Sequence, residues 1–277
     1  MISYNQKEIQ KLRVVNLASG SKGNSYFVSA GNTKILIDCG ISYKQLTERL
    51  SEIGESPSNI DYILISHEHS DHTAGLETFC KKHNTRVYVN HLSAEYIAKN
   101  KPSIAEFLQS FDREVMSLGE FLVYPIPVSH DSVFCTAFKI ECEDGSVSIV
   151  TDLGFVDENI LGAVAGSKVV YIESNHDENM LMNCKYPYII KKRILSDHGH
   201  LSNRAAANAI SRLYNFGTKY FVLSHISENS NTYEKAYVTI ANILLNDGID
   251  PDKDLTIRFA HQHKVGNNFI LGGKHND

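Results

Sequence analysis

Apolar residues recur along the chain in two rhythms, every second position or every third to fourth, and these rhythms predict its strands and helices. Alternation or a short apolar run predicts strands at 12–18, 25–30, 33–38, 61–66, 86–89, 120–128, 133–141, 146–151, 168–173, 219–224, 255–260 and 268–271. Helical spacing predicts helices at 42–54, 73–83, 156–165, 202–214 and 232–246, and helical stretches across 91–109. Because strands dominate the middle of each half and helices come between them, we expect an α/β (α+β) fold, an αββα sandwich of two mixed β-sheets flanked by helices.

One continuous domain is expected over 1–277, because no Pro-, Gly- or Ser-rich linker divides the chain. A length of 277 residues with 42% hydrophobic side chains is enough to bury a sizeable core. No apolar run approaches the ~18 residues that cross a bilayer, and the start of the chain lacks the apolar stretch of a secretory signal. We therefore expect a cytoplasmic protein that does not bind a membrane, with an oligomeric state that stays open.

The most informative segment is the run His67-Glu68-His69-Ser70-Asp71-His72, which follows the predicted buried strand 61–66. His67 and His69 are two residues apart, so in an extended loop they project to the same side. Asp71 and His72 come at the expected start of the helix 73–83, where side chains diverge and can serve a second ion. Imidazole and carboxylate ligands suit zinc, manganese or iron, and such ions activate water. The run predicts a metal-dependent hydrolase; a His-rich surface loop is the alternative.

Three more polar residues end predicted apolar strands: His130 in LVYPIPVSHD, Asp152 in VSIVTDLG and His225 in YFVLSHIS. Each alone is equally consistent with a structural polar residue. In this order, behind the His-rich run, they are the expected remaining ligands of a site for two divalent ions. The predicted metal ligands are His67, His69, Asp71, His72, His130, Asp152 and His225.

This ordered set, together with Asp38, resembles the five motifs of the metallo-β-lactamase superfamily. The resemblance covers most of the chain and implies that family's fold. It implies that one metal is held by His67, His69 and His130, the other by Asp71, His72 and His225, with Asp152 bridging them. Asp38 would orient a ligand. Asp152 in place of a cysteine, and the presence of His72, are unlike the antibiotic-degrading branches.

Three further segments, at 17–28, 172–181 and 194–203, are similar to the YycJ/WalJ-like branch of that superfamily. The resemblance implies a DNA exonuclease acting 5′-to-3′ on duplex DNA through a hydroxide held by two metal ions. The segment SDHGHLS has His198 where the branch more often has arginine, which would weaken a phosphate contact without changing the class.

Residues around the segment GHLSN are candidate catalytic and substrate contacts. Ser202 or Asn203 is the expected N-cap of helix 202–214, and a helix N-terminus attracts anions. We expect His200 to protonate a leaving oxygen and Asp71 to orient the nucleophile. A capping-loop His without catalytic role is the alternative for His200. His176 and Lys22 are further candidate substrate contacts, with a surface histidine and a simple turn as their alternatives.

The distribution of charge along the chain narrows the expected class of substrate. The chain has a net charge of −5, but 185–219 holds seven basic residues and one acid, so this window is +6 and the remainder −11. Such a segment suggests an anionic partner, with DNA favoured, or a solvated helix face. An acyl hydrolase (lactonase or thioesterase) and a non-catalytic metal-bearing binding module are the alternative functions. The native metal, DNA against RNA, and exonuclease against endonuclease action stay open.

Overall fold

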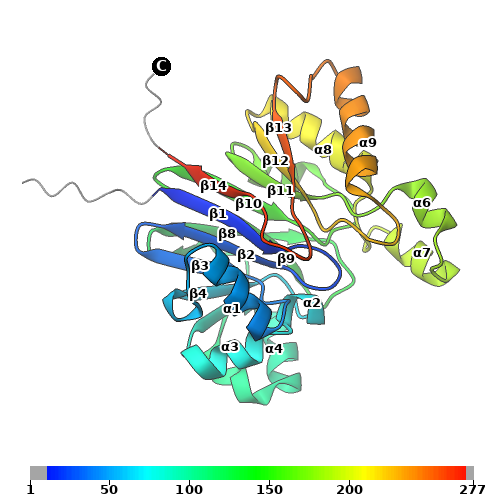
Figure 1. Cartoon of the computed structure of the whole chain (residues 1–277). Helices are drawn as coiled ribbons and strands as arrows, with labels where there is room; N and C mark the ends of the chain where they lie inside the picture. The colour runs from blue at the N-terminus through cyan, green and yellow to red at the C-terminus, as the bar shows by residue number, and fades with distance from the viewer. Residues whose placement is uncertain (1–10, 273–277) are drawn as a thin grey trace, which may run out of the picture.

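A computed structural model describes residues 11–272 and contains two seven-stranded sheets packed face to face (Figure 1). The first sheet has the order β14 (Asn268–Leu271), β1 (Leu12–Ala18), β2 (Ser25–Ala30), β3 (Thr33–Ile37), β4 (Tyr62–Ile65), β5 (Arg86–Asn90) and β6 (Leu108–Phe111). The second has the order β13 (Thr256–Phe259), β12 (Tyr220–Ser224), β11 (Val169–Glu173), β10 (Gly145–Val150), β9 (Cys135–Cys142), β8 (Phe121–Val128) and β7 (Met116–Leu118).

Helices cover the outer face of each sheet (Figure 1). The first sheet is covered by α1 (Tyr43–Glu52), α3 (Leu76–His83) and α4 (His91–Asn100), with the short helices η1 (Pro57–Asn59), α2 (Ser70–Thr73) and η2 (Pro102–Phe107) between them. The second is covered by α5 (Glu158–Val164), α8 (Asn203–Asn215) and α9 (Tyr233–Asn246), while α6 (Glu178–Asn183) and α7 (Tyr188–Ile194) lie at its edge. The expected αββα sandwich is confirmed.

Three apolar layers hold this arrangement together. One lies between the sheets, where Tyr26 of β2 meets Tyr171 of β11 edge to face at 5.3 Å between ring centroids. The other two lie between each sheet and its helices, centred on residues such as Phe79 and Phe221. Burial of apolar area is the main favourable term in folding. Strands with helices on one face and the other sheet on the other are therefore apolar at nearly every position, instead of at every second one.

Both sheets are mixed, and this decides where the site lies. Strands β3, β4, β5 and β6 run parallel, as do β10, β11, β12 and β13, while the remaining pairs are antiparallel. The carboxyl ends of neighbouring parallel strands therefore share one edge of each sheet, where loops commonly carry function.

Two local predictions need correction, and three short elements were not predicted. The helical stretches expected across 91–109 end at Asn100, because Pro102 cannot continue an α-helix; η2 and strand β6 follow. The predicted helix 73–83 is in two pieces, and Gly75 donates its N–H to Cys39 O, 2.8 Å away, where they separate. The short strand β7 and the helices α6 and α7 were not predicted.

The described residues contain no helix long and apolar enough to span a membrane. Residues 1–10 and 273–277, the two ends of the expected single domain 1–277, lie outside the described residues.

Candidate metal centre

Backbone strain marks the edge where the parallel strands end. Four non-glycine residues within 11–272 have positive φ, and three of them are predicted site residues: Asp38 (61°), Asp152 (61°) and His225 (54°). They follow β3, β10 and β12, respectively. The left-handed region is unfavourable for residues with a Cβ, so such conformations persist where the surrounding structure imposes them, often at functional sites.

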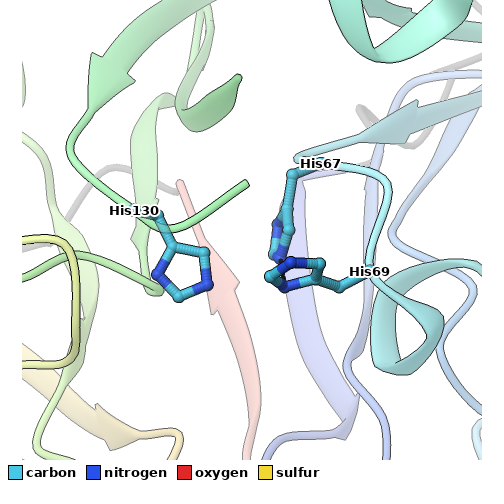
Figure 2. A group of neighbouring side chains, drawn as sticks. All are labelled: His67, His69 and His130. Carbon is cyan, nitrogen blue, oxygen red and sulfur yellow. Dashed lines mark hydrogen bonds between the residues drawn. The ribbon is translucent and has the colours of Figure 1, made fainter. Parts of the chain in front are cut away.

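His67, His69 and His130 point their rings toward one another, the first two from the loop after β4 and the third from a facing loop (Figure 2). Nε2 of His67 lies 3.0 Å from Nδ1 of His69. One nitrogen from each of the three side chains lies within 4.8 Å of the others. This is the first predicted ligand set, and the structure brings it together.

The contacts of His67 and His130 suit metal binding. Nδ1 of His130 donates to Gly199 O at 3.2 Å, which leaves Nε2 without a proton. Nδ1 of His67 lies 3.0 Å from the hydroxyl of Ser66. Burial holds the pKa of His67 well below its usual range, and burial likewise lowers the pKa of His130. Neutral imidazoles are the form in which histidine binds a metal.

The second predicted set surrounds Asp152. Nε2 of His72 lies 3.3 Å from one oxygen of Asp152 and 3.4 Å from Asp71 Oδ2. Nε2 of His225 lies 4.0 Å from Asp71 Oδ2, and His130 Nε2 lies 4.0 Å from the other oxygen of Asp152. Asp152 is therefore placed between the two groups, as a bridging ligand requires.

The buried atoms of this region fit a cation. Asp152 Oδ2 and His225 Nε2 are buried and form no hydrogen bond within the described residues. An unpaired buried carboxylate oxygen is energetically costly, and a divalent ion is a partner that satisfies it together with imidazole nitrogens. The donor set, nitrogen and carboxylate oxygen, matches zinc, manganese or iron.

Asp38 holds His72 in place. Its Oδ2 lies 2.7 Å from Nδ1 of His72, and the carboxylate also accepts from the backbone N–H of Ser66 at 2.9 Å and from the Ser66 hydroxyl. With its Nδ1 proton held by Asp38, His72 presents Nε2 toward Asp152. This is the orienting contact expected of Asp38.

Glu173 is a site residue that the sequence interpretation missed. It ends β11 and is fully buried. One oxygen faces Nδ1 of His200 at 2.9 Å and Nδ1 of His225 at 2.6 Å, while the other accepts from the backbone N–H groups of Leu201 and Leu153. Burial alone would raise its pKa, but His200 and His225 lower the pKa of Glu173 to about 2. The available signal was a lone acid at the end of a buried strand, the same context as Asp152.

An alternative cation grouping is also present, since ligand atoms of Asp152, Glu173, His200 and His225 lie within 4.8 Å of one another. Glu173 already accepts four hydrogen bonds, which occupies the lone pairs of a carboxylate. We therefore interpret Glu173 as the residue that positions His200 and His225.

Glu68 is a second missed residue. Its two oxygens accept from the backbone N–H of Val133 at 2.7 Å and from the Ser93 hydroxyl at 2.9 Å. These bonds tie the His-rich loop to the segment that carries His130, so Glu68 fixes the spacing within the histidine trio.

A cavity of about 390 Å³ opens over the site. Its floor is formed by His69, Asp71, His130, Asp152, His200 and His225, and its opposite wall by Tyr186, Ile190, Arg193 and Ile194 from the α6–α7 segment. Asp131, next to His130 in the chain, pairs with Arg193 across the rim. His200 and Asp71, the predicted catalytic residues, are thus exposed to the same space.

The predicted substrate contacts lie elsewhere. Ser202 caps α8 by accepting from Ala205 N, and Asn203 is buried with its amide oxygen bound to the Ser174 hydroxyl. His176 is 1% exposed, and neither Ser202, Asn203 nor His176 lines the cavity. Lys22 is exposed and pairs with Glu228 at 2.7 Å. The structure keeps His200 at the cavity and does not bring these four side chains to it.

Comparisons with known proteins agree with this geometry. A model of the metallo-beta-lactamase superfamily matches residues 18–225. The chain is 35% identical over 234 residues to exodeoxyribonuclease WalJ of Streptococcus pneumoniae strain D39, covering 82% of this chain and 86% of that protein. It is 33% identical over 235 residues to exodeoxyribonuclease YycJ of Bacillus anthracis, covering 84% and 89%.

Among solved structures, the metallo-beta-lactamase fold protein YhfI from Bacillus subtilis is similar in fold, with a TM-score of 0.71 at 16% identity over 95% of this chain and 100% of that chain. The family match extends from the end of β1 to His225, and so includes every residue of both predicted ligand sets. The chain therefore belongs to the metallo-β-lactamase superfamily.

Proposed function

We propose that this protein is a metal-dependent phosphodiester hydrolase that degrades DNA from an end, 5′-to-3′ on duplex DNA. The observation that carries the proposal is the position of Asp152 between two groups of imidazoles, at the floor of a cavity whose opposite wall carries Arg193. The two similar exodeoxyribonucleases, each matched over more than four fifths of its length, support DNA as the substrate.

The proposed site holds two divalent ions, one at His67, His69 and His130 and the other at Asp71, His72 and His225, with Asp152 between them. When bound, such ions lower the pKa of water and offset negative charge on a phosphoryl group. The ligands include two carboxylates against two ions of charge +2, which favours an anionic substrate.

His200 is the proposed proton donor to the leaving oxygen. Its Nδ1 is held by Glu173 at 2.9 Å, so its Nε2 faces away from Glu173 and its side chain is 17% exposed at the cavity. This contact fixes the orientation of the ring, so that a proton on Nε2 points toward the cavity, where the leaving oxygen would lie. Asp71, which is partly exposed at the same cavity, is placed to orient the attacking water.

The basic window 185–219 divides into two parts in the structure. Arg212 forms a paired contact with Glu158 at 2.5 Å, and Lys219 lies 3.8 Å from the ring centre of Tyr214. These two are consistent with a solvated helix face. The first part of the window, with Arg193 at the cavity wall, is where an anionic strand would approach.

A substrate panel tests the proposed function. Metal-loaded protein is offered bis(nitrophenyl) phosphate, duplex DNA labelled at either 5′ or 3′ ends, single strands, RNA and a lactone, with and without chelator. We expect mononucleotide release from 5′ ends that chelator abolishes. Lactone cleavage without phosphodiester cleavage would establish an acyl hydrolase instead, and internal cuts would establish an endonuclease.

A further inference from the structure

Helix α7 carries the most exposed apolar side chains of the described residues. Tyr188 is 73% and Ile189 is 74% exposed, more than any other large hydrophobic residue within 11–272. No residue of this helix is buried. Leaving two adjacent large apolar side chains in water is unfavourable, so such a pair at the edge of a site is typical of a binding surface.

The helix that carries this pair adjoins the cavity. Ile190 and Ile194, one turn apart on α7, line the cavity wall, and Tyr188 and Ile189 at the start of the same helix lie on its other faces, beside that wall. In Figure 1, α6 and α7 lie away from the two sheets at the margin of the molecule. A strand whose phosphate reaches the cavity floor therefore passes this helix.

The charge around the pair fits a polyanion. Residues 179–196 contain four basic residues and no acid, in a chain whose net charge is −5. Among the described residues, neither Lys185 nor Lys192 forms an ion pair, and Lys191 binds only the carbonyl of Met182. Apolar side chains between unpaired lysines are the combination that binds stacked bases and phosphates together.

The helix is fastened to the site. Arg193 pairs with Asp131, whose other oxygen lies 3.3 Å from Nε2 of His130. Before the helix, the hydroxyl of Tyr186 accepts from the amide of Asn229 at 2.7 Å. Gly199 packs so closely that a Cβ there would lie 2.2 Å from Ile194 O. The exposed pair is thus held at a fixed distance from the catalytic floor.

We propose that Tyr188 and Ile189 form the docking surface on which the terminal base pair of a DNA duplex stacks, with Lys185 and Lys192 contacting the adjacent phosphates. This inference rests on the proposed function and names the part of the substrate that this surface receives. Stacking the last pair against α7 sets the distance from the duplex end to the cavity, and so selects ends over internal sites.

The test compares Tyr188→Ala, Ile189→Ser and Tyr188→Trp with two controls that remove exposed apolar side chains elsewhere, Leu245→Ser on α9 and Tyr96→Ala on α4, where the residues are 54% and 47% exposed. The readout is the ratio of DNA hydrolysis to bis(nitrophenyl) phosphate hydrolysis, because a folding defect lowers both rates together. We expect Tyr188→Ala to raise KM for duplex DNA roughly tenfold and to lower the ratio by the same factor. Tyr188→Trp keeps the ratio, and so do the controls.

Binding is measured separately from catalysis, with metal-free protein and a duplex carrying 2-aminopurine as its terminal base. We expect the wild-type protein to change the probe's fluorescence and Tyr188→Ala to weaken binding. If no variant differs from its control in the ratio and in this titration, the docking surface is wrong. If sedimentation shows that the wild type self-associates and Tyr188→Ala does not, the pair is an interface between copies instead. Wild-type protein that binds the duplex end but hydrolyses no phosphodiester overturns the proposed function and leaves the docking proposal supported.

Discussion

Oε1 of Glu173 lies 2.6 Å from Nδ1 of His225, and both side chains are buried at the carboxyl ends of neighbouring parallel strands. The same oxygen faces His200. One carboxylate thus positions a proposed metal ligand and a proposed proton donor. Metal binding and proton donation thus depend on the same side chain, so the loss of Glu173 affects both.

Replacing Glu173 with glutamine is expected to lower kcat about 10–100-fold, as is usual when the partner of a ligand is removed. The amide keeps the shape of the side chain, but its N–H₂ group donates, so it cannot accept both from the two imidazoles and from the backbone N–H groups of Leu201 and Leu153. Steady-state kinetics with bis(nitrophenyl) phosphate and metal affinity by chelator competition check this. The matched control is Glu158→Gln, at the exposed pair with Arg212; an unchanged kcat together with an unchanged metal affinity in Glu173→Gln contradicts the positioning role.

Removing the carboxylate of Asp38 is expected to weaken metal binding. Asp38→Ala leaves Nδ1 of His72 without its partner at 2.7 Å and places alanine at a φ of 61°. Asp38→Asn keeps one oxygen and tolerates that backbone conformation better. We expect a 10–100-fold loss of metal affinity for alanine and a smaller loss for asparagine, measured by competition with a chelator. Equal affinities for both variants would refute an orienting role for Asp38.

Metal loading is expected to stabilise the fold, because the ions bind the native site and not the unfolded chain. At a free metal concentration 100 times Kd the gain is about 2.7 kcal/mol. The measurement is the Tm of protein with and without zinc or manganese, and with chelator. Asp152→Asn should largely lose this response, since Asp152 contacts both groups of imidazoles. An unchanged response in Asp152→Asn would place the ions elsewhere.

His176 is expected to make stability depend on pH. Burial lowers the pKa of His176 from 6.5 to about 4, and both its ring nitrogens form no hydrogen bond within the described residues. Between pH 6.5 and 4 the unfolded chain binds a proton at His176 that the folded chain does not bind. The contribution of His176 to the free energy of unfolding is therefore full above pH 6.5 and falls by about 3 kcal/mol as pH drops to 4.

Urea denaturation of metal-free protein at pH 7, 6 and 5 checks this. Within that window, His176→Gln should flatten the dependence by at most about 1.4 kcal/mol per pH unit relative to wild type. His91→Gln, at an exposed position, is the control. If His176→Gln and His91→Gln depend equally on pH, His176 does not titrate as stated.

Strands β1, β2 and β14 begin and end at the predicted residues. β1 and β2 are almost wholly buried, and the sequence shows them as short runs rich in apolar residues. Six of the seven predicted ligands follow strands of the two parallel sets, β4, β10 and β12, while His130 follows the antiparallel strand β8 of the second sheet. Glu173 was missed because a single acid after a strand carries no spacing signal, and its role depends on His200 and His225, which lie far away in the chain.

Helix α7 was missed for a different reason. Helical periodicity is a sign of an apolar face turned to a core, and α7 has no buried residue. Its sequence, YIIKKRI, has three apolar residues followed by three basic residues, which is not the pattern of a helix with one apolar face. The same lack of burial that hides this helix from pattern reading is what makes Tyr188 and Ile189 candidates for substrate contact.

The positive φ angles at Asp38, Asp152 and His225 have a consequence for redesign of the metal centre. A laboratory that exchanges ligands to change metal preference is free to vary His67, His69 and His130, whose backbones are ordinary. At the other three positions each new side chain inherits a conformation that glycine, asparagine and aspartate adopt most readily. Selection libraries for this scaffold should therefore concentrate diversity on the histidine trio, and treat the three strained positions as fixed.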